Sequence, residues 1–419
     1  MSAIGSLSGD NNKWIGLLKI LFFIVSIIAL MPNLNFPAPS FSVYLYWIIF
    51  FGVICCFIAL KSEIPYKEVP IIRVYLFMYI IYIPYSIHMA EDYWDIKELI
   101  ENLMIYLIPL CVYKISSPNR LVPILSFWYR YCWIIFLFFL IPFIKETDAI
   151  GKFNVPFTFA LLFFSCLNRK MKLLSLGALA LMLLFNLDDR SDSIKMIVCL
   201  LLGLIPYFRF FSKMVWSYKL LRILAFLLPF ILLFLGATGV FNVFDFESYI
   251  GDGDKYSIKN NQGNDESLLA DSRTILYTEA VASSVINNYV LQGRSMSRGY
   301  DSSFFAALYD TNQYTGRYGE RRTSESLLLT VFTYFGIIGV VIYFIIFWIA
   351  TSRAINKSNN IYIKMLGLYM CFRWVWLWIE DYARVDANTL LMWFMLAMCF
   401  SPYWRNLSNE DFKRVIKKI

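Results

Sequence analysis

The sequence predicts an all-α, polytopic membrane protein. Of its 419 residues, 59% are hydrophobic and 16% are charged, whereas an ordinary soluble domain is about 45–50% apolar and about 25% charged. The apolar residues form long continuous runs, and glycine and proline are too few for the many turns of a membrane β-barrel. The composition therefore excludes a soluble enzyme, a secreted disulfide scaffold and a disordered chain.

Twelve apolar runs are candidates for membrane-spanning helices, since a span needs about 20 largely apolar residues. In chain order they are 14–31, 41–60, 69–89, 99–114, 121–143, 149–167, 171–187, 194–212, 220–243, 325–350, 361–380 and 387–402. The first run lacks a small-residue cleavage site, so we expect it to be retained as a helix. All eight cysteines fall inside apolar runs, which predicts neither a disulfide in the polar segment nor a cysteine metal site.

The distribution of basic residues predicts the orientation of these helices. With the N-terminus in the cytoplasm, the cytoplasmic segments hold 20 lysine and arginine residues and the short outer loops hold 6. Basic residues concentrate in the short loops on the cytoplasmic side. Both termini are therefore expected in the cytoplasm.

One long polar segment follows the ninth run and is therefore expected on the outer side. The predicted parts are helices 1–9 (1–243), the large outer loop (244–324), helices 10–12 (325–402) and a basic cytoplasmic tail (403–419). A loop of this length is usually functional or disordered. We expect it to fold as a lid or binding loop over a cavity in the membrane domain.

A helix is predicted inside the loop, because apolar residues recur there at helical spacing. Asp271 and Ser272 resemble an N-cap. The residues expected on its apolar face are Ile275, Ala282, Val285, Ile286 and Tyr289.

Arginines on the predicted outer side are the first candidates for chemistry. Arg190 lies in an acidic turn, 188–193, and Arg273 lies at the start of the loop helix. A hydrated turn with a local ion pair, or a helix cap with a solvated arginine, also explains each of them. Arg294, Arg298 and Tyr300 belong to a glycine-bounded turn, 293–301, which fits either an anion or sugar site or an ordinary surface turn.

The entry to the tenth run combines charges with a helix start. Thr323 or Ser324 is expected to cap the helix and to place Glu325 in its first turn, where the helix dipole stabilises an anion. Arg321 precedes Glu325 by four residues, so the two share a face if the helix begins early. Arg321 and Arg322 are candidates for substrate binding, although a capped, ion-paired helix start also explains this cluster.

These motifs resemble those of the O-antigen ligase and polymerase superfamily. Glu325-Ser326, nine residues, then Gly336-Ile337-Ile338-Gly339 has the spacing of a signature at the end of that family's large periplasmic loop. Ser272-Arg273 and Arg190-Ser191 resemble its two arginine positions. The chain departs from the ligases by having Glu325 where they have histidine, which favours a polymerase. The architecture is also similar to lipid-linked-sugar (GT-C-like) glycosyltransferases.

The resemblance implies glycosyl transfer from an undecaprenyl-pyrophosphate-linked oligosaccharide at the periplasmic face of the bacterial inner membrane. It implies no metal, no cofactor and no nucleic acid; the partners implied are the lipid bilayer, a flippase and a chain-length regulator. Arg190 and Arg273 are expected to hold the pyrophosphate. Glu325 is the candidate base for the acceptor hydroxyl, with a positioning or ion-pair role as the alternative.

Two questions stay open at this stage. Arg373 lies near the middle of the eleventh run, and an intramembrane arginine is either a functional group or half of a structural ion pair. The alternatives to a polymerase are a ligase that joins polysaccharide to lipid A-core and, in a different class, a flippase for lipid-linked oligosaccharides.

Overall fold

The computed structural model describes most of the chain. The described residues are 9–30, 39–141, 147–185, 190–208, 214–245, 257–259, 265–267, 273–310, 317–381 and 386–419. Side chains are not described at 9–10, 39–43, 147–148, 190, 257–259, 265–267 and 308–310. Asp271 and Ser272, the expected N-cap of the loop helix, lie outside the described residues.

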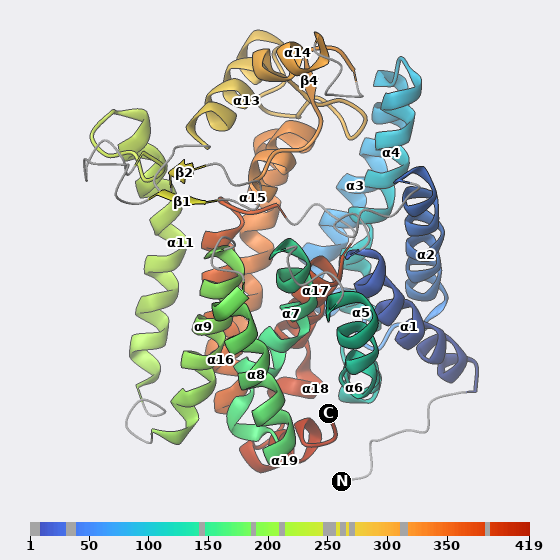
Figure 1. The fold of residues 1–419 in the computed structure, drawn as a ribbon, viewed down its shortest axis with the longest axis vertical. Helices are drawn as coiled ribbons and strands as arrows, with labels where there is room; N and C mark the ends of the chain where they lie inside the picture. The colour runs from blue at the N-terminus through green and yellow to red at the C-terminus, as the bar shows by residue number, and fades with distance from the viewer. Residues whose placement is uncertain are drawn as a thin grey trace.

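The described chain is almost entirely helical, which confirms the all-α fold class (Figure 1). The helices before the large loop are α1 (Gly9–Ile28), α2 (Pro39–Ala59), α3 (Pro70–Met89), α4 (Tyr93–Ile105), α5 (Cys111–Lys114), α6 (Pro118–Ile135), α7 (Thr147–Leu162), α8 (Arg169–Phe185), α9 (Arg190–Leu204) and α11 (Val215–Ala237). Short 3₁₀ turns lie at Tyr66–Glu68, Ile108–Leu110, Phe164–Cys166 and Ile205–Tyr207, and a π-helical turn at Phe136–Leu140 continues α6.

The loop and the C-terminal part contain the remaining elements. The helices are α13 (Thr274–Ile286), α14 (Ser303–Asp310), α15 (Leu327–Asn356), α16 (Ile361–Trp376), α17 (Ala387–Phe400), α18 (Pro402–Arg405) and α19 (Asn409–Ile416). Two antiparallel pairs of short strands join β1 (Ser257–Lys259) to β2 (Asp265–Ser267) and β3 (Tyr300–Asp301) to β4 (Glu320–Arg321). The helix predicted inside the loop is therefore present as α13.

Several helices are suited to crossing a bilayer. By length and composition, five qualify within the described chain: Asn11–Ile28, Pro70–Met89, Pro118–Leu140, Val215–Ala237 and Leu327–Asn356. Further apolar helices, at Tyr44–Ala59, Ala149–Leu162, Thr274–Ile286 and Ala387–Phe400, are shorter. The structure thus supports an all-α membrane protein, and the count of twelve spans remains a prediction.

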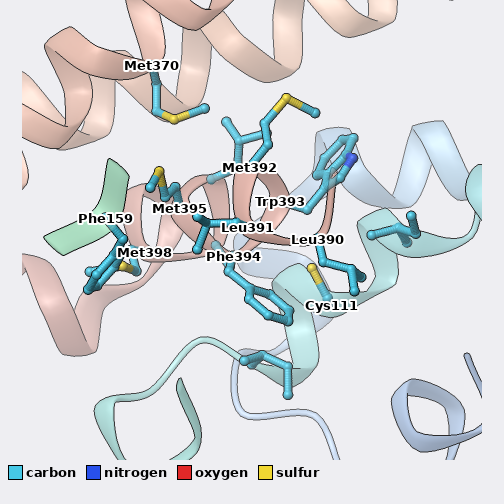
Figure 2. Close-up of a cluster of buried hydrophobic side chains, with 14 of the residues drawn as sticks. Cys111, Phe159, Met370, Leu390, Leu391, Met392, Trp393, Phe394, Met395 and Met398 are labelled. Carbon is cyan, nitrogen blue, oxygen red and sulfur yellow. The ribbon is translucent and has the colours of Figure 1, made fainter. Parts of the chain in front are cut away.

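The core of the bundle is built around α17. This helix is apolar all round, so it can be buried on every side. Thirteen of its fourteen residues are buried. Figure 2 shows its leucine, methionine, tryptophan and phenylalanine side chains packed against Cys111 of α5, Phe159 of α7 and Met370 of α16.

The two ends of the bundle carry different segments. In Figure 1, α4, α13, α14 and β4 lie at one end, and α18 and α19 lie at the other. Basic residues expected in the cytoplasm meet at the α18 end: Lys114 Nζ donates to Leu60 O at 2.5 Å and Arg120 Nη1 donates to Lys61 O at 2.7 Å. Tyr403 of α18 donates from the same region to Glu63 O at 3.3 Å.

The predicted span 325–350 differs from the observed helix, because α15 begins at Leu327 and is interrupted at Gly336, whose φ of 64° and ψ of −160° are not helical. A break frees backbone groups that lipid cannot satisfy. Residues 290–294 of the loop occupy the break and bond these groups. The hydrogen bonds run from Ile337 N to Val290 O (3.0 Å), from Ile338 N to Leu291 O (3.3 Å) and from Arg294 N to Thr333 O (2.7 Å).

Two glycines make this insertion possible. Gly293 and Gly336 both have positive φ, 76° and 64°. A Cβ on Gly293 would overlap the backbone of residues 334–336, and a Cβ on Gly336 would overlap the backbone of residues 291 and 293. Gly336, the first of the two glycines in the predicted signature, therefore has a structural role, which is to let the loop enter the helix.

Candidate functional site

The three motifs singled out in the sequence converge in space. The starts of α9, α13 and α15 meet at residues 376–380, the segment that ends α16 and continues beyond it. The contacts are a hydrogen bond from Ser191 Oγ to Glu380 Oε2 (2.6 Å), one from Arg273 Nε to Ile379 O (3.0 Å) and one from Leu327 N to Glu380 O (3.0 Å). The positive ends of three helix dipoles thus lie around one short segment, an arrangement that favours anions.

Glu325 lies between two arginines at this junction. Arg273 Nη2 is 3.7 Å from Glu325 Oε2, and Arg321 Nη2 is 3.4 Å from Glu325 Oε1. Arg321 and Glu325 are four residues apart but precede α15, so their contact does not arise from a shared helical face, which the sequence predicted only for an early helix start. The Glu325 side chain is 47% exposed, and exposed ion pairs contribute only about 0–1 kcal/mol. A bound anion can therefore compete with Glu325 for these arginines at small cost.

The cap of α15 differs from the prediction. Ser326 caps the helix, accepting from Leu329 N at 3.3 Å, so Glu325 precedes the first turn. Ser324, one of the expected caps, instead donates from its hydroxyl to Ser326 O at 2.7 Å. The hydroxyl of Ser324 is used to hold the turn before the helix, which leaves the capping position to Ser326.

The apolar residues predicted to share one face of α13 lie mostly on its exposed side. Ile275, Ala282, Val285 and Ile286 are exposed, and of the expected set only Tyr289 is buried. The buried residues of the helix are Leu276, Ala280, Ser283 and Ser284. Ser283 faces inward because its hydroxyl accepts hydrogen bonds from Tyr289 Oη (2.8 Å) and Asp301 N (3.0 Å).

An apolar groove adjoins Arg273. It has a volume of about 490 Å³ and lies between the end of α11, α13 and the end of α16. Leu232 and Leu233 line it from α11, and Val281 and Ala282 line it from α13. Its edge is formed by Thr274, the residue after Arg273. A cationic site and an apolar groove are therefore side by side, which suits a ligand with a charged head and a hydrocarbon tail.

A buried ion cluster at the same junction was not found by sequence reasoning. Lys195 is 1% exposed, and its Nζ lies 2.6 Å from Glu380 Oε1 and also pairs with Asp192. Asp192 and Lys195 are three residues apart at the start of α9, a spacing that could have signalled the pair. Their contact with Glu380, far along the chain, could not have been read from spacing.

Arg190 and Arg373 are the two remaining arginines of the predicted site. The side chain of Arg190 lies outside the described side chains, so its distance from Arg273 stays a prediction. Arg373 is 3% exposed and donates from Nη1 and Nη2 to Asn388 Oδ1 at 3.2 and 3.1 Å. Arg373 is therefore held inside the protein, beside Tyr369.

The other predicted substrate-binding arginines have partners within the protein. Arg298 Nε donates to Glu320 Oε1 at 3.1 Å, and Arg294 Nη2 lies 3.2 Å from the same oxygen. Arg317 Nη1 joins them, at 2.9 Å from Asp95 of α4. These pairs fasten the loop to α4, so Arg294 and Arg298 are left out of the site proposed below.

Tyr300 and Arg322 are also engaged in packing. Tyr300 is fully buried against Leu276, Ala280 and Leu329, so its ring packs inside the protein and is left out of the site proposed below. Arg322 lies over the Trp94 ring, with Cζ at 5.3 Å from its centroid, and 3.8 Å from Glu98. Both residues join the loop to the bundle.

Replacing Glu320 with glutamine is expected to destabilise the protein. Glu320 is buried and pairs with Arg294, Arg298 and Arg317. Removing one partner of a buried ion pair leaves an uncompensated charge and typically costs about 3–5 kcal/mol. Thermal unfolding in detergent measures the loss.

The matched control for this change is Glu410→Gln. Glu410 is an exposed residue of α19 that forms a surface ion pair with Lys413. Such pairs contribute about 0–1 kcal/mol. Equal unfolding temperatures for the two variants would contradict a structural role for the Glu320 cluster.

Acid is expected to loosen the attachment of the loop. Burial raises the pKa of Asp301, but the hydrogen bond and charge of Arg294 outweigh it and hold that pKa below its usual value. A carboxyl whose pKa is lowered in the folded state stabilises the fold above its unfolded pKa, and this contribution is lost as the pH falls through the folded pKa. Hydrogen exchange in residues 290–321, corrected for intrinsic rates, should therefore accelerate below about pH 4.

The control for the pH experiment is Asp301→Asn, which removes the titrating group. It should show less change between neutral and acidic pH than the parent protein. Exchange protection that is the same at both pH values in the parent would argue against this ion-pair attachment.

Comparison with known protein families finds no family model that matches the chain, and no curated protein is significantly similar to it. The functional assignment therefore depends on the residues and their geometry.

Proposed function

We propose that this protein is an O-antigen polymerase, a glycosyltransferase that moves a growing glycan from undecaprenyl pyrophosphate to the next lipid-linked repeat unit. We assign the end of the bundle that carries residues 273–324 to the periplasmic side of the bacterial inner membrane. The observation that carries the proposal is the meeting of Arg273, Arg321 and Glu325 at the starts of α13 and α15, directly beside an apolar groove.

The cationic part of this site suits the leaving group. In the reaction, the bond between the anomeric carbon and the phosphate oxygen breaks, and the diphosphate leaves with the bonding electrons. Its negative charge therefore grows as the bond lengthens. Arg273, aided by Arg190 and by the helix starts, would stabilise that charge through charge-assisted hydrogen bonds. No divalent cation is then required for leaving-group stabilisation.

The apolar groove suits the lipid part of the same substrate. A groove of about 490 Å³ takes the segment of polyprenyl chain nearest the head group. The remainder of the chain can run along α11, most of whose side chains are exposed. The lipid would thus hold the diphosphate at Arg273 without leaving the bilayer.

Glu325 is proposed as the group that accepts the proton of the acceptor hydroxyl. The hydroxyl oxygen forms the new bond to the anomeric carbon while its proton passes to a Glu325 oxygen. The half-exposed carboxylate is accessible to an acceptor, and it lies 3.7 Å from the arginine that would hold the leaving group. General-base help of this kind typically contributes about 10²–10⁴-fold to the rate.

The proposal is tested by reconstitution. Purified protein in vesicles, given undecaprenyl-pyrophosphate-linked repeat units without ATP or added metal, is expected to produce a ladder of longer lipid-linked saccharides. Chelation with EDTA should leave the ladder unchanged. Absence of elongation, or complete dependence on Mg²⁺ or Mn²⁺ after chelator controls, would contradict the mechanism.

A flippase for lipid-linked oligosaccharides is the second candidate, favoured by the interruption of α15 at Gly336. Interrupted helices are typical of transporters, where the break lines a substrate cavity. Here residues 290–294 occupy the break, so we place this function second. Deleting the gene distinguishes the candidates: a polymerase mutant keeps single repeat units on the lipid core, a ligase mutant keeps none, and a flippase mutant retains units inside the cell.

A further inference from the structure

The loop helix α13 has an inverted distribution of polarity. Every exposed side chain on it is apolar except Thr278; the others are Ile275, Val281, Ala282, Val285 and Ile286. Ile286 is 75% exposed and Val285 is 60% exposed. The side that packs on the protein, in contrast, contains two serines.

A helix surrounded by water normally shows the opposite arrangement, with its apolar stripe against the core. Serine is tolerated on the inner side of α13 because the hydroxyls of Ser283 and Ser284 are hydrogen-bonded there. The exposed side of α13 has no polar side chain that needs hydration apart from Thr278. The helix is therefore matched to apolar surroundings on its outside.

This apolar face has surfaces suited to lipid near it. After the exposed Asn287 and Asn288 comes Leu291, which is exposed and whose carbonyl accepts a hydrogen bond from Ile338 N of α15. Ile337, Ile338 and Val341 of α15 are also exposed, and α15 as a whole is a candidate membrane span. Val281 and Ala282 of this face also line the apolar groove that α13 shares with α11, which is another candidate span.

We propose that α13 is an interfacial membrane helix, with Ile275, Val285, Ile286 and Leu291 inserted among the acyl chains of the leaflet on the loop side. A helix with one apolar face binds a membrane in the plane of the interface, in proportion to the apolar area that it buries. The large loop is then anchored at the bilayer surface, and Arg273 at the start of α13 lies at head-group depth. This inference does not depend on the glycosyltransferase activity.

The test places a bimane fluorophore on Ile286→Cys in phospholipid vesicles, in a Cys55→Ser background, since Cys55 is half-buried and the other seven cysteines are buried. Lipids with a nitroxide on the acyl chain quench labels in the hydrocarbon, and iodide quenches labels in water. Phe234→Cys on the exposed side of α11 is the lipid control, and Glu410→Cys on α19 is the water control.

Nitroxide-lipid quenching at position 286 is expected to equal that at position 234 and to exceed that at position 410 at least about twofold, with little iodide quenching. A label quenched by iodide as strongly as the one at position 410 would overturn the proposal, because the face would lie in water. A label protected from both quenchers would also overturn it, because a second copy or another protein would cover the face. Val285→Cys replaces Ile286→Cys if the latter lowers the unfolding temperature.

Discussion

Replacing Arg273 with alanine is expected to abolish the elongation of lipid-linked saccharides while leaving the protein inserted and folded. Arg273 would hold the diphosphate as its charge develops, and removing one such donor typically lowers the rate about 10²–10³-fold. Its ion pair with Glu325, at 3.7 Å, is partly exposed, and it donates a hydrogen bond to Ile379 O, so the loss of these two contacts is expected to cost only about 1–2 kcal/mol of stability. The measurement is the saccharide ladder formed by reconstituted vesicles, with Arg190→Ala expected to give the same result.

Two variants separate the loss of a phosphate contact from a general loss of charge. Arg273→Lys keeps the charge but loses the planar, bidentate geometry, so it should retain part of the activity. Arg414→Ala on α19, at the opposite end of the bundle, removes a more exposed arginine (69% against 31% for Arg273) and should be without effect. A full-length ladder from Arg273→Ala or Arg190→Ala would exclude the diphosphate-binding role of that residue.

Substitution of Gly336 by alanine is expected to destabilise the end of the bundle that carries α13 and α14. Its φ of 64° disfavours any side chain, at about 1–3 kcal/mol. The added Cβ would also overlap the backbone of residues 291 and 293, and overpacking of this kind typically costs about 1–3 kcal/mol more. A large fall in the unfolding temperature in detergent, accompanied by faster hydrogen exchange in residues 290–294, is the expected result.

Gly177→Ala is the matched control for this change. Gly177 lies in α8, where an added Cβ meets nothing within 4 Å. Alanine favours a helix by about 1 kcal/mol over glycine, so this variant should be at least as stable as the parent. Equal stability of Gly336→Ala and the parent would show that residues 290–294 do not need to enter the helix.

The positions of the main elements could be predicted because each depends on local composition. The helix within the loop was expected from its apolar spacing, and it is present as α13. The spacing did not determine which side of the helix packs on the protein. The orientation depends on the hydrogen-bond partners of Ser283, which come from residues 289 and 301, and helical periodicity contains no information about them.

The candidate site was likewise predictable from the sequence only in part. Arg273, Arg321 and Glu325 were singled out from residue type and from their place near helix starts, but the pairing of Arg321 with Glu325 forms in the non-helical segment before α15. The contact of Arg273 with Glu325, and of Lys195 with Glu380, joins residues that are far apart in the chain. Nothing in local spacing distinguishes Arg273, which lies at the junction, from Arg298, which is buried in an ion-pair cluster.

The order of apolar and polar residues was sufficient to specify a helical membrane protein, since transfer of apolar side chains out of water depends on composition and on little else. Tertiary packing decided which arginines contact the half-exposed Glu325 and which are held by the buried Glu320. The same is true of the interruption of α15, where Gly336 needs the backbone of residues 290–294 to bond the groups that it frees. Hydrogen bonds and ion pairs are directional and short-ranged, so they acquire partners only when distant segments of the chain have been brought together.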